Sequence, residues 1–273
     1  MKKRSLFSRI IGTPYVIWSL MFIVAPLLFV LYFAFTDRDG AFTFENILSL
    51  SSYSETFIMS LGFSLIATTV CLLIGYPLAY CMARQSERSR SILLVMLMLP
   101  MWISLLIRTY SLMALLDNGG IVSTFLTSLG FEKLTFIGTD GAVILGMVYD
   151  FLPYMVLPIY TSLTKLDNRY IEAASDLGCN SVQALIKVIL PLTTPGIISG
   201  VTMVFVPSIS TFYISQKLGG GSFDLLGDTI ERQFQNAVTY HTGAAVSLVM
   251  MILILLSLAI MNKFSDNEEE IIV

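Results

Sequence analysis

Six long apolar stretches constrain the fold of this chain more than any other feature. They cover residues 10–35, 57–82, 91–116, 141–164, 188–216 and 243–262. Each is long enough to cross the hydrocarbon core of a bilayer as a helix, which takes about 20 residues. Charged residues make up only 13% of the chain, and within the six stretches they are limited to Arg108 and Asp150. The sequence therefore predicts an all-α membrane protein with six transmembrane helices.

The basic residues predict the orientation of these helices. One set of connections, with the two termini, carries eleven Lys and Arg residues, whereas the alternate connections carry Arg38, Lys133, Lys217 and Arg232. Because basic residues collect on the cytoplasmic side, we expect both termini in the cytoplasm. The first stretch is too long for a signal peptide and lacks a small-residue cleavage site, so we interpret it as an anchor.

The chain divides on this basis into three parts. Residues 1–56 hold the cytoplasmic tail, the first helix and an outer loop. Residues 57–262 form a five-helix core with a long cytoplasmic connection at 165–190, and residues 263–273 are an acidic cytoplasmic tail.

Several kinds of chemistry have no signature in this sequence. The glycines at 219–221 lack the following Lys-Ser/Thr of a phosphate-binding loop, and no metal-ligand spacing or catalytic triad occurs. The net charge of −3 does not favour nucleic acid as a partner. Cys71, Cys81 and Cys179 fall in or below the membrane, so we expect no disulfide. The single histidine, His241, is predicted to be a solvated loop residue. We therefore expect no enzyme activity, metal or cofactor on this chain.

The fourth connection is patterned as a helix. Asp167 is a plausible N-cap for residues 169–177, Gly178 ends that helix, and Asn180 or Ser181 can cap the next one. Glu172 and Asp176 share one face. The spacing of Tyr170, Ala173, Ala174 and Leu177 places these residues on the other face. Such a helix suits either docking into a groove on another protein or resting on lipid.

The residues of this connection also resemble a known motif. Glu172-Ala173-Ala174, followed by Gly178 and by Leu190-Pro191, resembles the EAA loop of type I ABC importer permeases, with Val188 in place of isoleucine. The resemblance implies the permease fold of that family. It also implies that the loop is a coupling helix, in which Glu172, Ala173, Ala174, Asp176 and Gly178 contact a cytosolic ATPase.

The same resemblance implies a set of partners and a location. Two cytosolic subunits would bind and use the ATP, and a second permease subunit, a related but non-identical chain, would complete the translocation path. An external substrate-binding protein would deliver the substrate to the outer loops. The location implied is the cell membrane of a prokaryote.

Further stretches resemble one branch of the family. Residues 190–200, 204–207, 218–221 and 225–234 resemble the spermidine/putrescine importer permeases, with Ser210 as a minor departure. Permeases for ferric iron, thiamine and phosphonates share parts of these motifs and stay as alternatives. A secondary transporter is a further alternative, although it would be expected to show inverted repeats or more intramembrane charges.

A substrate path can be sketched from the polar and aromatic residues of the helices. Straight helices would place Arg108 and Asp150 at matching depths, either as a structural ion pair or with Asp150, below Asp117, attracting cations. Aromatic faces suit the methylenes and ammonium groups of polyamines. The aromatic candidates, which could equally pack helices together, are Trp102, Tyr110, Tyr149, Tyr154 and Tyr213.

Overall fold

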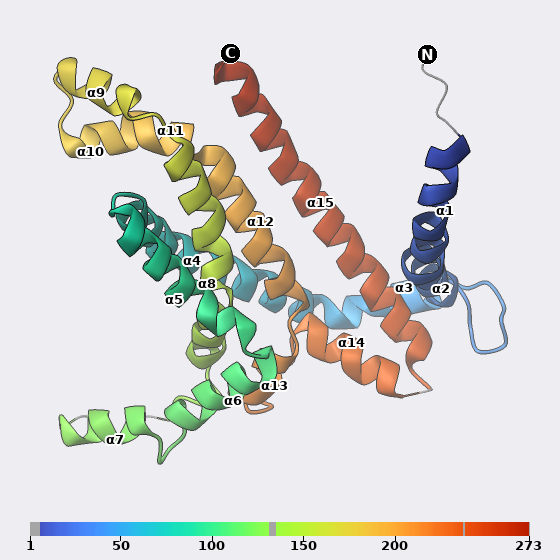
Figure 1. Cartoon of the computed structure of the whole chain (residues 1–273). Coiled ribbons are helices and arrows are strands. Elements are labelled where there is room, and N and C mark those ends of the chain that lie inside the picture. The colour runs from blue at the N-terminus through green and yellow to red at the C-terminus, as the bar shows by residue number, and fades with distance from the viewer. Residues whose placement is uncertain (1–5, 131–134, 237, 273) are drawn as a thin grey trace. The chain divides into compact units, whose positions relative to one another are not determined.

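The computed structural model describes residues 6–130, 135–236 and 238–272, with side chains described for 13–130, 135–236 and 238–263. This part of the chain is helical, and its one extended pairing is a single bridge between Thr36 and Phe42 (Figure 1). The helices are α1 Leu6–Ser19, α2 Ala25–Ala34, α3 Glu45–Leu48, α4 Ser54–Ala83, α5 Glu87–Trp102, α6 Leu105–Leu116, α7 Ile121–Ser128, α8 Asp140–Lys165, α9 Asn168–Asp176, α10 Ser181–Ala184, α11 Leu190–Leu192, α12 Thr194–Ser210, α13 Tyr213–Leu218, α14 Leu226–Gln235 and α15 Tyr240–Ile272. Short π-helical turns at Leu20–Val24 and Leu185–Ile189 and a 3₁₀ turn at Ser49–Tyr53 link some of them.

Four of the six predicted spans are continuous. Helical segments at Thr13–Ala34, Glu45–Ala83, Asp140–Lys165 and Tyr240–Lys263 are long and apolar enough to cross a membrane. They correspond to the first, second, fourth and sixth apolar stretches. The prediction of an all-helical membrane protein is confirmed, and the count of six spans depends on two bent helix pairs.

The expectation of a straight third helix over 91–116 is wrong. The chain bends by 94° between Glu87–Trp102 and Leu105–Ser128. Pro100 lies in the last turn of α5, where its ring removes one backbone donor, and Ile103 then adopts an extended conformation. A backbone that turns at this depth must have its polar groups satisfied within the protein.

The fifth apolar stretch, residues 188–216, is likewise bent rather than straight. Ser181–Leu192 and Thr194–Ser210 meet at 67°, and Thr193 leaves the helical conformation between Pro191 and Pro195. The Thr193 hydroxyl donates to the carbonyl of Ile189 over 2.8 Å, which satisfies the broken turn locally. Thr211 is extended, so residues 213–218 form the separate helix α13.

The described chain forms two compact units. Unit 1 joins the chain up to Glu55 with Thr229–Leu253, and unit 2 joins Thr56–Asp228 with the chain from Ile254 onward. The predicted division after residues 56 and 262 is a different partition and stays a prediction.

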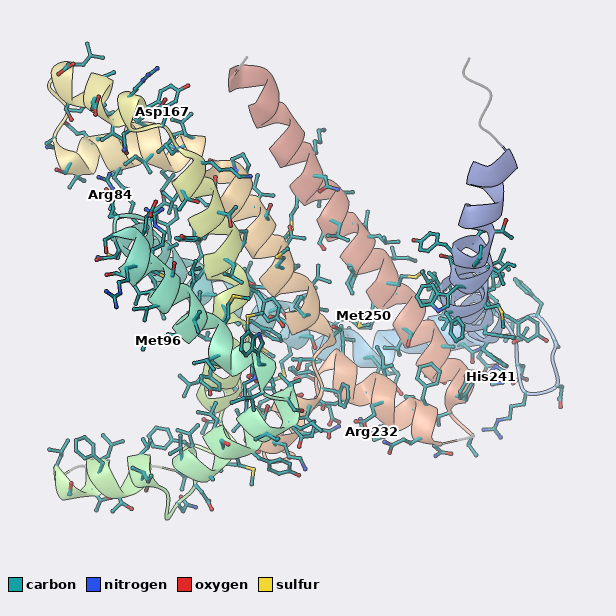
Figure 2. All side chains as sticks on the ribbon, in the orientation of Figure 1. Arg84, Met96, Asp167, Arg232, His241 and Met250 are labelled. Carbon is teal, nitrogen blue, oxygen red and sulfur yellow. The ribbon has the colours of Figure 1, made fainter. Side chains whose placement is uncertain are left out.

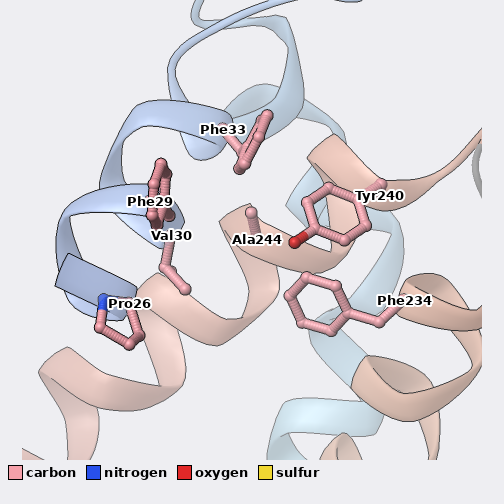
Figure 3. Close-up of a pocket in the computed structure, with 7 residues that line it drawn as sticks. All are labelled: Pro26, Phe29, Val30, Phe33, Phe234, Tyr240 and Ala244. Atoms are coloured by element: carbon pink, nitrogen blue, oxygen red, sulfur yellow. The ribbon is translucent and has the colours of Figure 1, made fainter. Parts of the chain in front are cut away.

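Unit 1 packs α2 against the first turns of α15 through small side chains. Ala34, Ala244 and Ala245 are fully buried there, and their small size allows close approach of the two helices. Beside them lies an apolar pocket of about 430 Å³. The Tyr240 ring stands between Phe33 and Phe234 at this pocket, with centroid distances of 5.0 and 4.8 Å (Figure 3). Its lining residues are Pro26, Phe29, Val30, Phe33, Phe234, Tyr240 and Ala244.

His241 also belongs to unit 1, and the prediction that it is solvated is wrong. It lies in the first turn of α15, half-buried, with Nδ1 3.1 Å from the carbonyl oxygen of Phe33. The Phe33 ring packs against the imidazole edge-on at 5.4 Å.

Unit 2 contains the larger core, which centres on α8. Met147, Met155, Val156 and Ile159 of α8 are buried completely. Gly196 and Gly200 let α12 approach α8 so closely that an added Cβ would lie 2.5 Å from the Ser162 side chain or 2.8 Å from Met155 Sδ. Small residues at helix contacts are the usual device for packing helices in a membrane.

The two ends of unit 2 carry different connections. Figure 1 shows α9 and α10 at one end of the unit and α7 at the opposite end. Arg84 and Asp167 lie toward the end that carries α9 (Figure 2). A small cleft there is lined by Tyr80 in the last turn of α4, by Arg84 just after that helix, and by Asn168 and Ile171 of α9. The fourth connection is therefore seated on the helical core of unit 2.

Candidate functional site

The fourth connection forms the helix–turn–helix that its capping residues predicted. The Asp167 side chain accepts a hydrogen bond from the Arg169 backbone at the start of α9. Asn180 and Gln183 form a reciprocal capping box at the start of α10. These caps use only local side chains, which is why the sequence located both helix starts.

Gly178 ends α9 as predicted. Its φ of +82° lies in the left-handed region, which side chains disfavour. The Cys179 backbone N–H donates to the carbonyl of Ala174, and the Gly178 N–H donates to that of Ser175. This pair of hydrogen bonds is the Schellman pattern that closes a helix at a left-handed glycine.

The surface that α9 exposes differs from the predicted one. Ala174 is 5% exposed and faces inward, with the half-buried Ile171 one turn before it. Tyr170 and Leu177 are instead 55% and 85% exposed. The spacing of residues in α9 shows that the helix is amphipathic. Which face is buried depends on the turn at 185–189 that packs against it, and the spacing within α9 carries no information about that neighbour. Glu172, Ala173 and Asp176 are exposed, as docking residues must be.

The two intramembrane charges form a buried ion pair. Arg108 Nη1 lies 3.2 Å from Asp150 Oδ1, and the two side chains are 6% and 1% exposed. Arg108 also donates to the Asp150 carbonyl over 3.4 Å, and the Thr109 hydroxyl donates to Asp150 Oδ2 at the same distance. Of the two interpretations of these charges, the structure favours the ion pair between α6 and α8. Neither group is open to a substrate in this conformation.

The aromatic candidates do not gather at one place. Tyr110 and Tyr213 form an edge-to-face pair, and Tyr154 packs against Phe151 in the core of unit 2. Trp102 is 74% exposed beside the bend in the third stretch. Tyr149 is 43% exposed on α8.

Asp117 ends α6 and lies exposed, and its carboxylate accepts the Asn118 N–H. Within the described chain, no hydrogen bond, ion pair or ring contact joins Asp117 or Trp102 to the other candidates. The structure therefore brings the candidates together as two separate pairs, Arg108 with Asp150 and Tyr110 with Tyr213, and not as one site.

Sequence reasoning missed a groove between α8 and α12. It has a volume of about 620 Å³ and places hydroxyl groups beside prolines at the close helix contact. The hydroxyls belong to Thr161, Ser162 and Ser199, and Lys165 lies at one end. Isolated hydroxyls in apolar runs carry little signal in a sequence, and only the packing of the two helices collects them.

A buried carboxylate in the fifth connection was missed as well. Asp228 is 5% exposed, and its Oδ2 accepts the Leu225 N–H over 2.9 Å. Burial raises the pKa of Asp228 to about 6, against the opposing effect of its hydrogen bonds. The adjacent Gly227 lies so close to the end of α12 that a Cβ would be 2.5 Å from the Thr211 carbonyl oxygen. The Leu226 N–H donates to the Ser60 hydroxyl of α4, which fixes this connection to unit 2.

The sequence model of the binding-protein-dependent transport system inner membrane component family matches residues 75–268. This range contains both the α9 connection and the buried ion pair. The chain belongs to this family. It is accordingly an inner-membrane permease component of a binding-protein-dependent ABC importer, and the predictions of family and location are confirmed.

Curated relatives extend over almost the whole chain. The spermidine/putrescine transport system permease protein PotB of Haemophilus influenzae is 39% identical over 267 residues, which cover 93% of each chain. PotB of Escherichia coli is 39% identical over 253 residues, 89% of this chain and 92% of the relative. The predicted resemblance to this branch is therefore confirmed.

Solved structures agree on the fold. A chain of a bacterial ABC transporter involved in the import of the acidic polysaccharide alginate superposes with a TM-score of 0.78 at 19% identity, covering 97% of this chain and 96% of that one. A chain of the MetNI methionine ABC transporter gives a TM-score of 0.56 at 16% identity, over 78% and 94%. The ABC importer permease fold is confirmed by these likenesses.

Proposed function

We propose that this chain forms half of the translocation path of an ATP-driven importer of polyamines, with spermidine and putrescine as substrates. The observation that carries the proposal is the 39% identity, over 93% of both chains, to a relative named for spermidine and putrescine transport. The partners in this proposal are two cytosolic ATP-binding subunits, a related second permease and an external binding protein. The ATP is bound by the partner subunits, and this chain itself binds no cofactor.

The substrate is tested by transport in the reconstituted importer. The permease pair, the ATPase and the binding protein from the same genome are placed in liposomes, and uptake of radiolabelled spermidine and putrescine is measured with and without ATP. We expect ATP-dependent uptake of both amines. ATP-dependent uptake of ferric iron, thiamine or a phosphonate without polyamine uptake would contradict the substrate. Uptake driven by an ion gradient alone would favour a secondary transporter.

We further propose that α9 is the coupling helix that contacts the ATPase. Glu172, Ala173 and Asp176 are exposed, and Tyr170 and Leu177 add apolar surface beside them. A short helix with exposed apolar and acidic side chains suits a groove with basic residues on a partner protein. Ala174 contributes by seating α9 on its own permease, and Gly178 by forming the turn at its end.

This role is tested by reversing one charge. In Glu172→Arg we expect at least a tenfold loss of substrate-stimulated ATP hydrolysis and uptake, with the permease still inserted and folded. Glu87→Arg is the matched control, because Glu87 is also exposed and lies in the first turn of α5. Gly178→Ala introduces strain at φ +82° of about 1 kcal/mol, so we expect a smaller loss. Coupling that is undiminished in Glu172→Arg would exclude the docking role.

A further inference from the structure

Two tyrosines from separate helices of unit 2 form an aromatic pair that already holds a cation. The rings of Tyr110 in α6 and Tyr213 in α13 have centroids 5.8 Å apart and planes at 79°. The ammonium nitrogen of Lys217 lies 5.3 Å from the Tyr110 centroid and 5.7 Å from that of Tyr213. Both distances fall within the range of about 6 Å in which a ring attracts a cation. The pair is therefore a formed site for an ammonium group.

The surroundings of the Lys217 ammonium allow another ammonium group to replace it. Lys217 forms no ion pair with a carboxylate in the part of the chain that the structure describes. Tyr110 is 49% exposed, and Tyr213 and Lys217 are half-buried. The Tyr110 hydroxyl also interacts with Lys217 and with the Tyr213 side chain. A cation held only by uncharged groups at a half-exposed place is bound weakly, so another ammonium can compete for the same place.

The chemistry of Lys217 matches one end of a polyamine. A lysine side chain is an ammonium group on a flexible four-carbon stem. The aminobutyl arm of putrescine or spermidine has the same composition. This comparison rests on the polyamine substrate proposed above. Lys217 therefore places in the site the chemical group that such a substrate would bring.

An acidic side chain lies at the end of α6, beyond Tyr110. Asp117 follows Tyr110 by seven residues, which is about two turns of α6 and about 10 Å along its axis. The side chain of Asp117 is exposed. A carboxylate at this distance can pair with another ammonium of a molecule whose first ammonium lies between the tyrosines.

We propose that Tyr110 and Tyr213 form a binding subsite for a terminal primary ammonium of the transported polyamine, and that the Lys217 ammonium is the intramolecular competitor that fills this subsite when substrate is absent. Substrate binding displaces Lys217 from the rings. The affinity of the subsite is thus set by the difference between two similar ammonium groups.

The test measures spermidine binding directly. The assembled permease–ATPase complex is placed in nanodiscs without the binding protein, and the Kd of radiolabelled spermidine is determined. Lys217→Gln removes the competitor, and we expect Kd to fall about three- to tenfold, the factor of one moderate cation–π contact. Tyr110→Leu should raise Kd by a similar factor, whereas Tyr110→Phe keeps the ring and loses only the hydroxyl, so its Kd should rise less than that of Tyr110→Leu. Arg38→Gln removes another exposed cation and is the control for net charge.

The double variant separates competition from simple repulsion. If Lys217 competes for the rings, Lys217→Gln gives no gain in affinity when Tyr110 is already Leu. A gain that persists in Tyr110→Leu, or a Kd that is unchanged or raised in Lys217→Gln, overturns the inference. Uptake by the wild-type importer is measured in parallel. If the wild type imports spermidine and Lys217→Gln does not change Kd, the inference about Lys217 is refuted and the proposed polyamine transport stands. If the wild type neither binds nor imports polyamines, both proposals are refuted.

Discussion

Replacing Arg108 and Asp150 one at a time and then together tests what holds α6 against α8. Their charged atoms are 3.2 Å apart and the side chains are 6% and 1% exposed. Removing one partner leaves the other charge buried and uncompensated, which costs about 3–5 kcal/mol. We therefore expect Arg108→Met and Asp150→Leu each to be destabilised by that amount.

The double variant Arg108→Met/Asp150→Leu should be far more stable than either single one. It removes both charges and replaces them with apolar groups of similar size, a change that is often neutral or stabilising. Thr109 loses its contact with the carboxylate but keeps its hydrogen bond to the Leu105 carbonyl at 2.9 Å, so no hydroxyl is stranded. We expect the double variant within about 2 kcal/mol of the wild type.

The measurement is SDS-induced unfolding of the permease in mixed micelles, together with uptake by the reconstituted importer. Ser111→Ala, on the exposed side of α6, serves as the control. Destabilisation of the double variant by the sum of the two single values would refute the mutual pairing. A double variant that is stable and still hydrolyses ATP but imports nothing would refute a purely structural role and assign the charges to the path.

Two further predictions concern packing and pH. In Gly196→Ala the new Cβ meets Ser162 at 2.5 Å and the Pro158 carbonyl oxygen at 2.9 Å, so we expect the free energy of SDS-induced unfolding to fall by about 1–2 kcal/mol. In the control Gly62→Ala the new Cβ meets nothing within 4 Å, so this variant should be as stable as the wild type or more stable by up to about 1 kcal/mol. A destabilised Gly62→Ala alongside an unaffected Gly196→Ala would contradict the α8–α12 packing. Because burial raises the Asp228 pKa from 3.8 to about 6, the folded protein holds this proton more tightly than the unfolded chain does. Stability relative to Asp228→Asn should therefore fall by about 2 kcal/mol as the pH rises from 4 to 7. A difference in stability that stays constant over this range would show that Asp228 titrates normally.

Local signals in the sequence located much of the fold and the α9 connection. The apolar lengths predicted the helices, since a bilayer core demands about 20 apolar residues from each span. Asp167, Asn180 and Gly178 predicted the ends of α9 and the start of α10, because capping uses side chains within a few residues. These features depend on residues that are close together in the chain, so they can be predicted without knowing the tertiary packing.

The errors arose where a local pattern permits more than one geometry. A proline removes a backbone donor without setting the angle of a bend, and the bends that follow Pro100 and Pro191 are 94° and 67°. The burial of Ala174 and the half-burial of His241 depend on segments that lie elsewhere in the chain. A helical face is buried by its neighbour, and the neighbour is not part of the helix's own sequence.

The sequence by itself determined that this chain spans a membrane, which stretches are apolar and helical, and which family of importer permeases the chain resembles. Those properties follow from apolar run lengths, capping residues and motif spacing, all of which are local. Only the tertiary structure decided the partners of the scarce charges. It joined Arg108 to Asp150, and it placed Lys217 between Tyr110 and Tyr213. Buried or ring-held charges are energetically acceptable only beside specific partners, and the packing of separate helices chooses those partners.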